Sequence, residues 1–136
     1  MKKITSAKIG KHQIRDLKVL IAEDDEISAL LLSSEFEIFS NDIFTVGTGV
    51  DALDTCRNNP AINLIMMDVR MPEMNGYEAT RQIRQFNKDV IIIANTAYGD
   101  GGEMEKERAT SVGCNEYISK PINFDLLTGL IHKYFQ

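Results

Sequence analysis

The stretch Ile62-Asn63-Leu64-Ile65-Met66-Met67-Asp68 is an apolar run that ends in an acid, and it decides how the rest of the chain is interpreted. Continuous apolar runs of this length are typical of strands covered on both faces of a parallel sheet. Open α/β sheets place their chemistry beyond the carboxyl ends of the strands. We therefore expect Asp68 to lie at the functional edge of such a sheet.

Polar side chains follow three other apolar runs in the same way. They are Glu23 and Asp24 after Val19–Ala22, Thr96 after Ile91–Asn95, and Lys120 shortly after Tyr117-Ile118. Because the carboxyl ends of parallel strands meet at one edge, the pattern predicts two or three carboxylates and one ammonium group in a single pocket.

Apolar runs alternate with amphipathic segments from Lys18 onward, which is the pattern of βαβ units. The strands are expected at 18–22, 42–46, 62–67, 90–95 and 115–118. The helices are expected at 26–37, 49–58, 75–86, 103–112 and 123–134. Five βα repeats in this length predict an α/β fold with a doubly wound parallel sheet.

The composition is that of a globular protein of one domain, with 136 residues, 43% hydrophobic and 26% charged. Residues 1–16 are basic and without a strong period, so we interpret them as a linker or arm that precedes a domain at 17–136. No apolar stretch is long enough to span a bilayer, and the N-terminus has no signal-peptide pattern. These features predict a cytoplasmic location.

The charge and the cysteines exclude two further classes of site. A net charge of -5 argues against direct nucleic-acid binding, which needs a basic face. Cys56 and Cys114 are far apart and have no partners at metal-binding spacing, so they are interpreted as buried free thiols.

The predicted pocket has the parts that phosphoryl transfer to a carboxylate requires. Asp68 can act as the nucleophile, because aspartate forms acyl phosphates. Glu23 and Asp24 offer the hard oxygen ligands that Mg²⁺ prefers. Lys120 supplies a compact positive charge and Thr96 a hydroxyl donor.

Four segments together resemble the receiver domain of two-component response regulators, from about Lys18 to the C-terminus. They are Glu23-Asp24, Met67-Asp68-Val69-Arg70-Met71-Pro72-Glu73-Met74-Asn75-Gly76, Thr96-Ala97 and Tyr117-Ile118-Ser119-Lys120-Pro121. The resemblance implies a flavodoxin-like (βα)5 fold, a five-stranded sheet in the order 2-1-3-4-5. It also implies a phosphoacceptor domain of a phosphorelay rather than an enzyme with a separate substrate.

The resemblance further implies roles for individual residues. Asp68 would accept a phosphoryl group from a phosphohistidine, with Mg²⁺ held by Asp24, Asp68 and the backbone carbonyl of Arg70. Glu23 would act mostly through a metal-bound water. Thr96 and Tyr117 would form the conformational switch, and the Lys120–Pro121 peptide bond would be cis.

The partners implied by the resemblance are a histidine kinase or a histidine phosphotransfer protein, with a homodimer possible. The wording of 75–80 and 117–122 looks most like receivers of hybrid sensor kinases. Together with the basic leading arm, it favours a C-terminal receiver excised from such a kinase.

Three other functions compete with this interpretation. An aspartyl-nucleophile phosphatase of similar fold generally needs a second acid two residues after the nucleophile, where this chain has Arg70. A flavin-binding module would suffer repulsion between its phosphate and Glu23-Asp24-Asp25. A non-phosphorylated interaction module would not need the complete set of pocket residues.

The first helix carries two apolar stripes. We expect Ile27, Leu30, Leu31 and Ile38 to face the sheet, and Ala29, Leu32 and Phe36 to form an outer patch for a four-helix phosphodonor. The alternative is that another part of the protein covers the outer patch. Asp25 is expected to cap this helix rather than to bind metal.

One loop departs from the commonest spacing of the family. The glycine-rich segment 98–103 adds about two residues before the fourth helix, and we expect it to be mobile without phosphate. Arg70 and Tyr98 are expected to flank the entrance to the phosphate. There they would either slow hydrolysis or lie as ordinary surface side chains.

Overall fold

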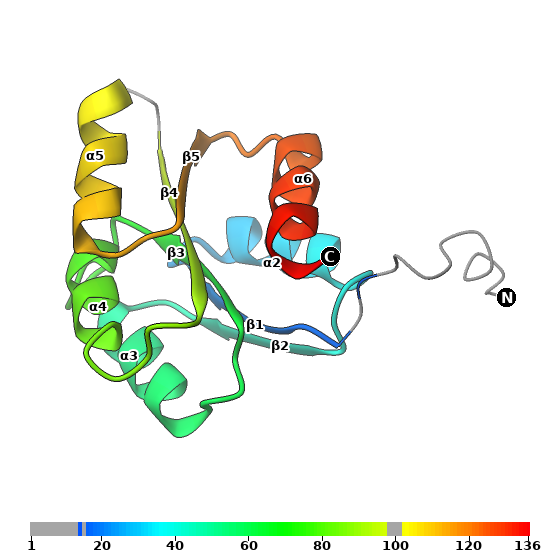
Figure 1. Cartoon of the computed structure of the whole chain (residues 1–136), viewed down its shortest axis with the longest axis horizontal. Helices are drawn as coiled ribbons and strands as arrows, with labels where there is room; N and C mark the ends of the chain where they lie inside the picture. Colours follow the sequence, from blue (N-terminus) through cyan, green and yellow to red (C-terminus); the bar gives the residue numbers. More distant parts are fainter. Residues whose placement is uncertain (1–13, 15, 98–101) are drawn as a thin grey trace, which may run out of the picture.

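A computed structural model describes residues 14, 16–97 and 102–136 of the chain, and the core of this part is one parallel sheet (Figure 1). The strands are β1 (Lys18–Ala22), β2 (Asp42–Val46), β3 (Leu64–Asp68), β4 (Ile91–Ala97) and β5 (Glu116–Lys120). Their order is β2-β1-β3-β4-β5, and all four pairings are parallel. The predicted five-stranded doubly wound fold is therefore confirmed.

Helices cover both faces of the sheet. They are α2 (Glu26–Phe36), α3 (Gly49–Asn58), α4 (Gly76–Ile83), α5 (Gly102–Val112) and α6 (Phe124–Phe135). Helices α3, α4 and α5 lie on one face, and α2 and α6 on the other, as Figure 1 shows. We call these the α3–α5 face and the α2–α6 face.

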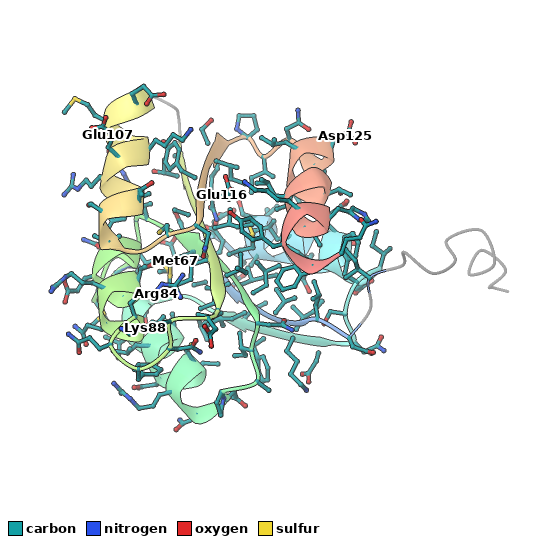
Figure 2. All side chains as sticks on the ribbon, viewed as in Figure 1. Met67, Arg84, Lys88, Glu107, Glu116 and Asp125 are labelled. Atoms are coloured by element: carbon teal, nitrogen blue, oxygen red, sulfur yellow. The ribbon has the colours of Figure 1, made fainter. Side chains whose placement is uncertain are left out.

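Alternation along each strand divides the buried side chains between two cores. In β3, Ile65 and Met67 pack on the α3–α5 face, whereas Leu64 and Met66 pack on the α2–α6 face. Figure 2 shows Met67 in the interior, with Glu107 and Asp125 on the outer sides of their helices. All five residues of β3 are buried. A strand covered on both faces needs apolar side chains at successive positions, which is why its sequence shows a continuous apolar run.

Four helices begin with a side-chain cap of the preferred residue types. The capping residues are Asp25 for α2, Thr48 for α3, Asn75 for α4 and Asn123 for α6. Asp25 accepts hydrogen bonds from both the backbone nitrogen and the hydroxyl of Ser28. The prediction that Asp25 caps the helix is confirmed, because its carboxylate accepts hydrogen bonds from the first turn of α2.

The orientation predicted for the first helix is wrong. Leu32 and Phe36 are buried in the core and Ala29 packs against it. The stripe expected to face the sheet is instead exposed, by 71% at Ile27, 69% at Leu30, 57% at Leu31 and 64% at Ile38. Both stripes are apolar, so helical periodicity alone did not distinguish them, and the docking of α2 onto the sheet decides which one is covered.

Other predicted boundaries shift by a few residues. Strand β3 begins at Leu64 because Asn63 turns its side chain to accept from the backbone nitrogen of Lys18, at 2.9 Å. Helix α4 ends at Ile83, followed by turns at Gln85 and Phe86. The expectation of a mobile loop concerns residues that lie mostly outside the described part of the chain.

The segment before β1 contributes to the core of the α2–α6 face. Ile14 and Leu17 are 6% and 4% exposed and belong to the same cluster as Phe39 and Ile131. The backbone nitrogen of Leu17 donates to the carbonyl oxygen of Phe39 at 3.2 Å. Both cysteines are free and buried, as predicted. Within the described residues, no helix has the length and apolar character to cross a bilayer.

Candidate functional site

Asp68 is the last residue of β3, and its neighbours in the sheet end at the same edge. Its side chain is buried, with the residue only 3% exposed. It pairs in register with Asn95 of β4, while the next strand on its other side, β1, leads directly into Glu23 and Asp24. The parallel arrangement thus brings the predicted acids together.

Oxygen atoms from Glu23, Asp24 and Asp68 all lie within 4.8 Å of one another. Glu23 is buried like Asp68, whereas Asp24 is open to solvent. Burial, followed by the negative charge of Glu23, raises the pKa of Asp68 to about 7. A hard divalent cation would relieve this repulsion and accept these ligands, so the donor set fits Mg²⁺.

Lys120 supplies the positive charge of the pocket. Its Nζ atom lies 2.7 Å from Oε1 of Glu23 and 3.6 Å from Oδ2 of Asp68. Burial alone would lower the pKa of Lys120, but the hydrogen bond to Glu23 and the charge of Asp68 raise it. The lysine therefore stays protonated beside the carboxylates.

The backbone after Asp68 is held closely against its surroundings. The nitrogen of Val69 donates to the carbonyl of Asn95, and that of Gly76 to the carbonyl of Val69, both at 2.9 Å. A Cβ atom on Gly76 would lie 2.2 Å from the carbonyl oxygen of Asp68. Only glycine fits there, which explains the Asn75-Gly76 pair at the start of α4.

Strand alternation assigns Thr96 and Tyr117 to the α3–α5 face of the sheet, opposite to that of Asp68. By alternation, Thr96 shares the α3–α5 face with Ala94, and Tyr117, which pairs with Ala94, packs against the same core. Thr96 is 5% exposed. Thr96 lies near the carboxyl end of β4 and Tyr117 near the start of β5, and their switch role stays a prediction.

The remaining predicted residues border the pocket. The backbone nitrogen of Arg70 donates to Oδ1 of Asp68 at 3.3 Å, while the Arg70 residue itself is exposed. The Lys120–Pro121 bond is cis, the geometry that the family resemblance implied. The use of the Arg70 carbonyl as a metal ligand stays a prediction.

A groove of about 460 Å³ runs from the carboxylates outward between α2 and the loop that leads into α6. Glu23 and Lys120 line it together with apolar side chains, among them Leu31, Leu32, Ile122 and Phe124. The groove thus ends at Glu23 and Lys120, the two residues of the pocket that also contact each other.

Asn95 was not among the residues predicted for the site, although it lies beside Asp68 and is 0% exposed. Its signal in the sequence is a single amide inside an apolar strand, directly before Thr96. Its burial and its register with Asp68 are properties of the folded chain.

The fold and the pocket define a class of domain, a doubly wound parallel α/β domain that holds a buried carboxylate beside two others and a lysine. The model of the response regulator receiver domain matches residues 19–132. The chain therefore belongs to the response regulator receiver family, as its motifs indicated.

Curated relatives of two kinds are similar to the chain. Sensor histidine kinase RcsC of Salmonella typhimurium is 32% identical over 119 residues, which are 88% of this chain and 12% of that protein. Hybrid signal transduction histidine kinase B of Dictyostelium discoideum is 36% identical, over 86% of this chain and 6% of the relative. The polar-differentiation response regulator DivK of Brucella ovis is 32% identical, over 85% of this chain and 94% of the relative.

Solved structures agree with the assignment. The Ssk1 receiver domain, crystallised with the histidine phosphotransfer protein Ypd1 of Saccharomyces cerevisiae, is 30% identical with a TM-score of 0.81 over 90% of both chains. The receiver domain of sensor histidine kinase PA1611 from Pseudomonas aeruginosa has a TM-score of 0.74 at 24% identity, covering 88% of this chain and 97% of that one. The second likeness concerns the fold alone.

Proposed function

We propose that this domain accepts a phosphoryl group from a phosphohistidine onto Asp68 in a Mg²⁺-dependent reaction, and that it works as a signalling switch rather than as an enzyme with a separate substrate. The observation that carries the proposal is the buried Asp68 carboxylate, which lies 3.6 Å from Lys120 Nζ within a cluster of three carboxylates. A nucleophile, a cation site and a fixed positive charge are thereby in one pocket.

In the transfer step, an Oδ atom of Asp68 forms a bond to phosphorus while the bond from phosphorus to the donor's imidazole nitrogen breaks. The electron pair stays on that nitrogen, and the donor leaves as a neutral histidine because its other ring nitrogen carries a proton. The product is an acyl phosphate on Asp68.

The chain's own residues prepare this step. Lys120 attracts the phosphoryl oxygens and stabilises the negative charge that remains after transfer. Asp24, Asp68 and the carbonyl of Arg70 would hold Mg²⁺, with Glu23 acting through a water molecule. The bound cation would neutralise part of the charge on the phosphoryl oxygens. Thr96 and Tyr117 would then respond by moving towards the new phosphate.

Two similar proteins support the chemistry and the partner. The Pseudomonas receiver domain has a magnesium ion coordinated in its active-site cleft. The Ssk1 receiver domain was crystallised with a histidine phosphotransfer protein. We propose the same cofactor for this chain, and a histidine kinase or a histidine phosphotransfer protein as its partner.

The partner would dock on the α2–α6 face. Exposed Ile27, Leu30 and Leu31 lie on α2, and the lining residues Ile122 and Phe124 lie on the far side of the groove. A helical phosphodonor could cover this apolar surface while its histidine enters above Asp68. This stripe replaces the one that the sequence suggested for docking.

The setting of the domain belongs to the proposal as well. Kinship with RcsC supports a receiver within a hybrid sensor kinase, and kinship with DivK supports a stand-alone regulator. The two free cysteines agree with a cytoplasmic location, where thiols stay reduced. A homodimer stays a prediction.

Intact mass tests the proposal after incubation with phosphoramidate, which carries the phosphorus–nitrogen bond of a phosphohistidine, and Mg²⁺. The wild type is expected to gain one phosphoryl group, about 80 Da, only when Mg²⁺ is present. Asp68→Asn should gain nothing, because the amide cannot act as the nucleophile.

Asp54→Asn is the matched control, since Asp54 is an exposed acid of α3 whose nearest cation is Arg57 at 3.8 Å. It should be phosphorylated as the wild type is. An adduct that persists in Asp68→Asn would place the phosphoryl group elsewhere. No adduct in the wild type, even with purified histidine phosphodonors, would favour the non-phosphorylated interaction module.

A further inference from the structure

Asn95 is a polar side chain enclosed on the α2–α6 face of the sheet. It is 0% exposed, and neither Oδ1 nor Nδ2 of its amide has a hydrogen-bond partner within residues 16–97 and 102–136. Its backbone carbonyl is used, because it accepts from Val69. A buried amide without partners costs stability and calls for a physical reason.

The register places this amide beside the phosphoacceptor. Asn95 pairs with Asp68 on one side and with Ile118 on the other. Residues paired across parallel strands point to the same face, so the three side chains form one row. Strand spacing puts the Cβ atoms of Asn95 and Asp68 about 5 Å apart, which is within reach of a hydrogen bond between an amide and a carboxyl oxygen.

Lys120 crosses this row. It starts on β5, and its Nζ atom reaches Asp68 on β3 and Glu23 beyond β1, so its side chain passes over β4. In the unphosphorylated pocket, Lys120 is paired with Oδ2 of Asp68, and the backbone nitrogen of Arg70 donates to Oδ1. The amide of Asn95 lies next to these groups without taking part.

Phosphorylation changes the balance of charge in the row. The negative charge moves from the carboxylate to the phosphoryl oxygens, and the ammonium group of Lys120 follows it. With phosphorus on Oδ1, the acyl oxygen that remains is Oδ2, which has lost Lys120 and needs a new donor. The Nδ2 group of Asn95 is the neighbouring donor without a partner among the described residues.

We propose that Asn95 is a positioning residue of the phosphorylated state, in which its Nδ2 amide donates a hydrogen bond to the acyl oxygen of phosphorylated Asp68. This inference rests on the proposed phosphorylation of Asp68. It adds a residue that shapes the lifetime of the product.

The hydrogen bond favours loss of the phosphoryl group. When water or a histidine attacks phosphorus, the bond from phosphorus to the Asp68 oxygen breaks and its electron pair returns to that oxygen. The resulting charge is shared by both carboxyl oxygens, so a donor to either one binds more strongly as the bond breaks. Asn95 therefore shortens the lifetime of the acyl phosphate.

Asn95→Leu tests the inference, because leucine has the same branching at Cγ and suits the apolar neighbours Ile93 and Ile118. After the phosphodonor is removed, intact mass should show loss of the phosphoryl group slowed by about tenfold, the effect of one hydrogen bond on the rate. The urea midpoint of the unphosphorylated variant should rise, since the unpaired amide is gone.

Ile93→Leu is the matched control, a change of shape on the same strand and the same face. Its phosphate lifetime should stay within about twofold of the wild type, since it removes no donor. Equal decay of Asn95→Leu and the wild type would overturn the inference and leave the proposed function intact. A wild type that gains no phosphoryl group would overturn both.

A spectroscopic measurement on the wild type does not depend on the folding of any variant. In ¹⁵N-labelled protein, the side-chain amide of Asn95 is identified by double-resonance assignment and by its loss in Asn95→Leu. Addition of beryllofluoride with Mg²⁺, which imitates the phosphoryl group, should move one of its two proton signals downfield. A signal that keeps its position while neighbouring backbone amides shift would overturn the inference.

Discussion

The two faces of the sheet differ in how closely their helices are joined. On the α3–α5 face, polar side chains connect α4 to α5, and α3 to the turn that follows α4. The hydroxyl of Tyr77 in α4 donates to Glu105 in α5, and the guanidinium of Arg108 lies 5.3 Å from the centre of the Tyr77 ring. Arg57 of α3 likewise lies 5.0 Å from the ring of Phe86. This face is closed.

On the α2–α6 face, the two helices stand apart at the edge that carries the site. The groove of about 460 Å³ opens there, and α2 carries the exposed side chains of Ile27, Leu30 and Leu31. Deeper in this layer, both helices bury side chains in one core cluster, and Phe39, which follows α2, meets the ring of His132 in α6 edge-on at 6.2 Å. The site therefore opens into a groove on one face and is backed by helices with polar contacts between them on the other.

The largest expected effect distinguishes the buried stripe of α2 from its exposed stripe. Phe36→Ala removes a fully buried ring and should lower the free energy of unfolding by about 3–5 kcal/mol. Leu30→Ala, on the exposed stripe, should change it by less than about 0.5 kcal/mol. Urea denaturation followed by circular dichroism measures both. Equal losses would show that α2 lies on the sheet in the other orientation.

The rigidity of the closed face is tested at its contact with the site. Gly76→Ala places a Cβ 2.2 Å from the carbonyl oxygen of Asp68, so it should cost about 3 kcal/mol and impair phosphorylation. In α6, Gly129 has nothing within 4 Å of an added Cβ, and Gly129→Ala should stabilise by about 0.5–1 kcal/mol. Thermal unfolding of the pair provides the measurement. If Gly76→Ala left the stability unchanged, the backbone at the start of α4 would be able to move away from Asp68.

The pH dependence of stability reports on the interior of the closed face. Burial raises the pKa of Cys114 from 9.0 to about 11, although a hydrogen bond to Thr80 opposes the shift. Because the pKa of this thiol is higher in the folded than in the unfolded protein, its contribution to the free energy of unfolding is complete below pH 9. That contribution is lost as pH rises through 11. That loss amounts to at most about 3 kcal/mol. Cys114→Ser should show a shallower decline than the wild type when urea midpoints are compared between pH 8 and 10.5. Parallel declines would contradict the burial of this thiol.

The smallest expected effect separates the polar contacts of the two faces. Tyr77→Phe removes the hydroxyl that donates to Glu105 from a residue only 7% exposed, and it should cost about 1 kcal/mol. Tyr134 of α6 also donates to a glutamate, Glu116, but nearer the surface, so Tyr134→Phe should cost less than about 0.5 kcal/mol. Chemical denaturation of both variants compares them. A greater loss at Tyr134 would reverse the ranking of the two faces.

Much of the fold could be predicted because its signals are local. The continuous apolar runs marked the strands, and the polar residues that follow them marked the edge where Glu23, Asp24, Asp68 and Lys120 meet. Asp25 could be assigned as a cap because its position directly before a helix has a known preference.

Other features depend on tertiary packing and could not be predicted in the same way. Helix α2 is apolar on both sides, so the choice between Phe36 and Leu30 for the core depends on how the helix meets the sheet. The importance of Asn95 depends on strand register and on the absence of partners among the described residues, neither of which a single sequence displays.

The burial of Ile14 bears on how the domain can be cut or fused. The family match begins at residue 19, and a truncation at that point would delete two side chains that the core encloses, Ile14 and Leu17. The fragment would expose Phe39, which packs in the same cluster, and would be less soluble than the longer chain. A fusion or truncation point is better placed before Ile14, so that the domain keeps both core residues.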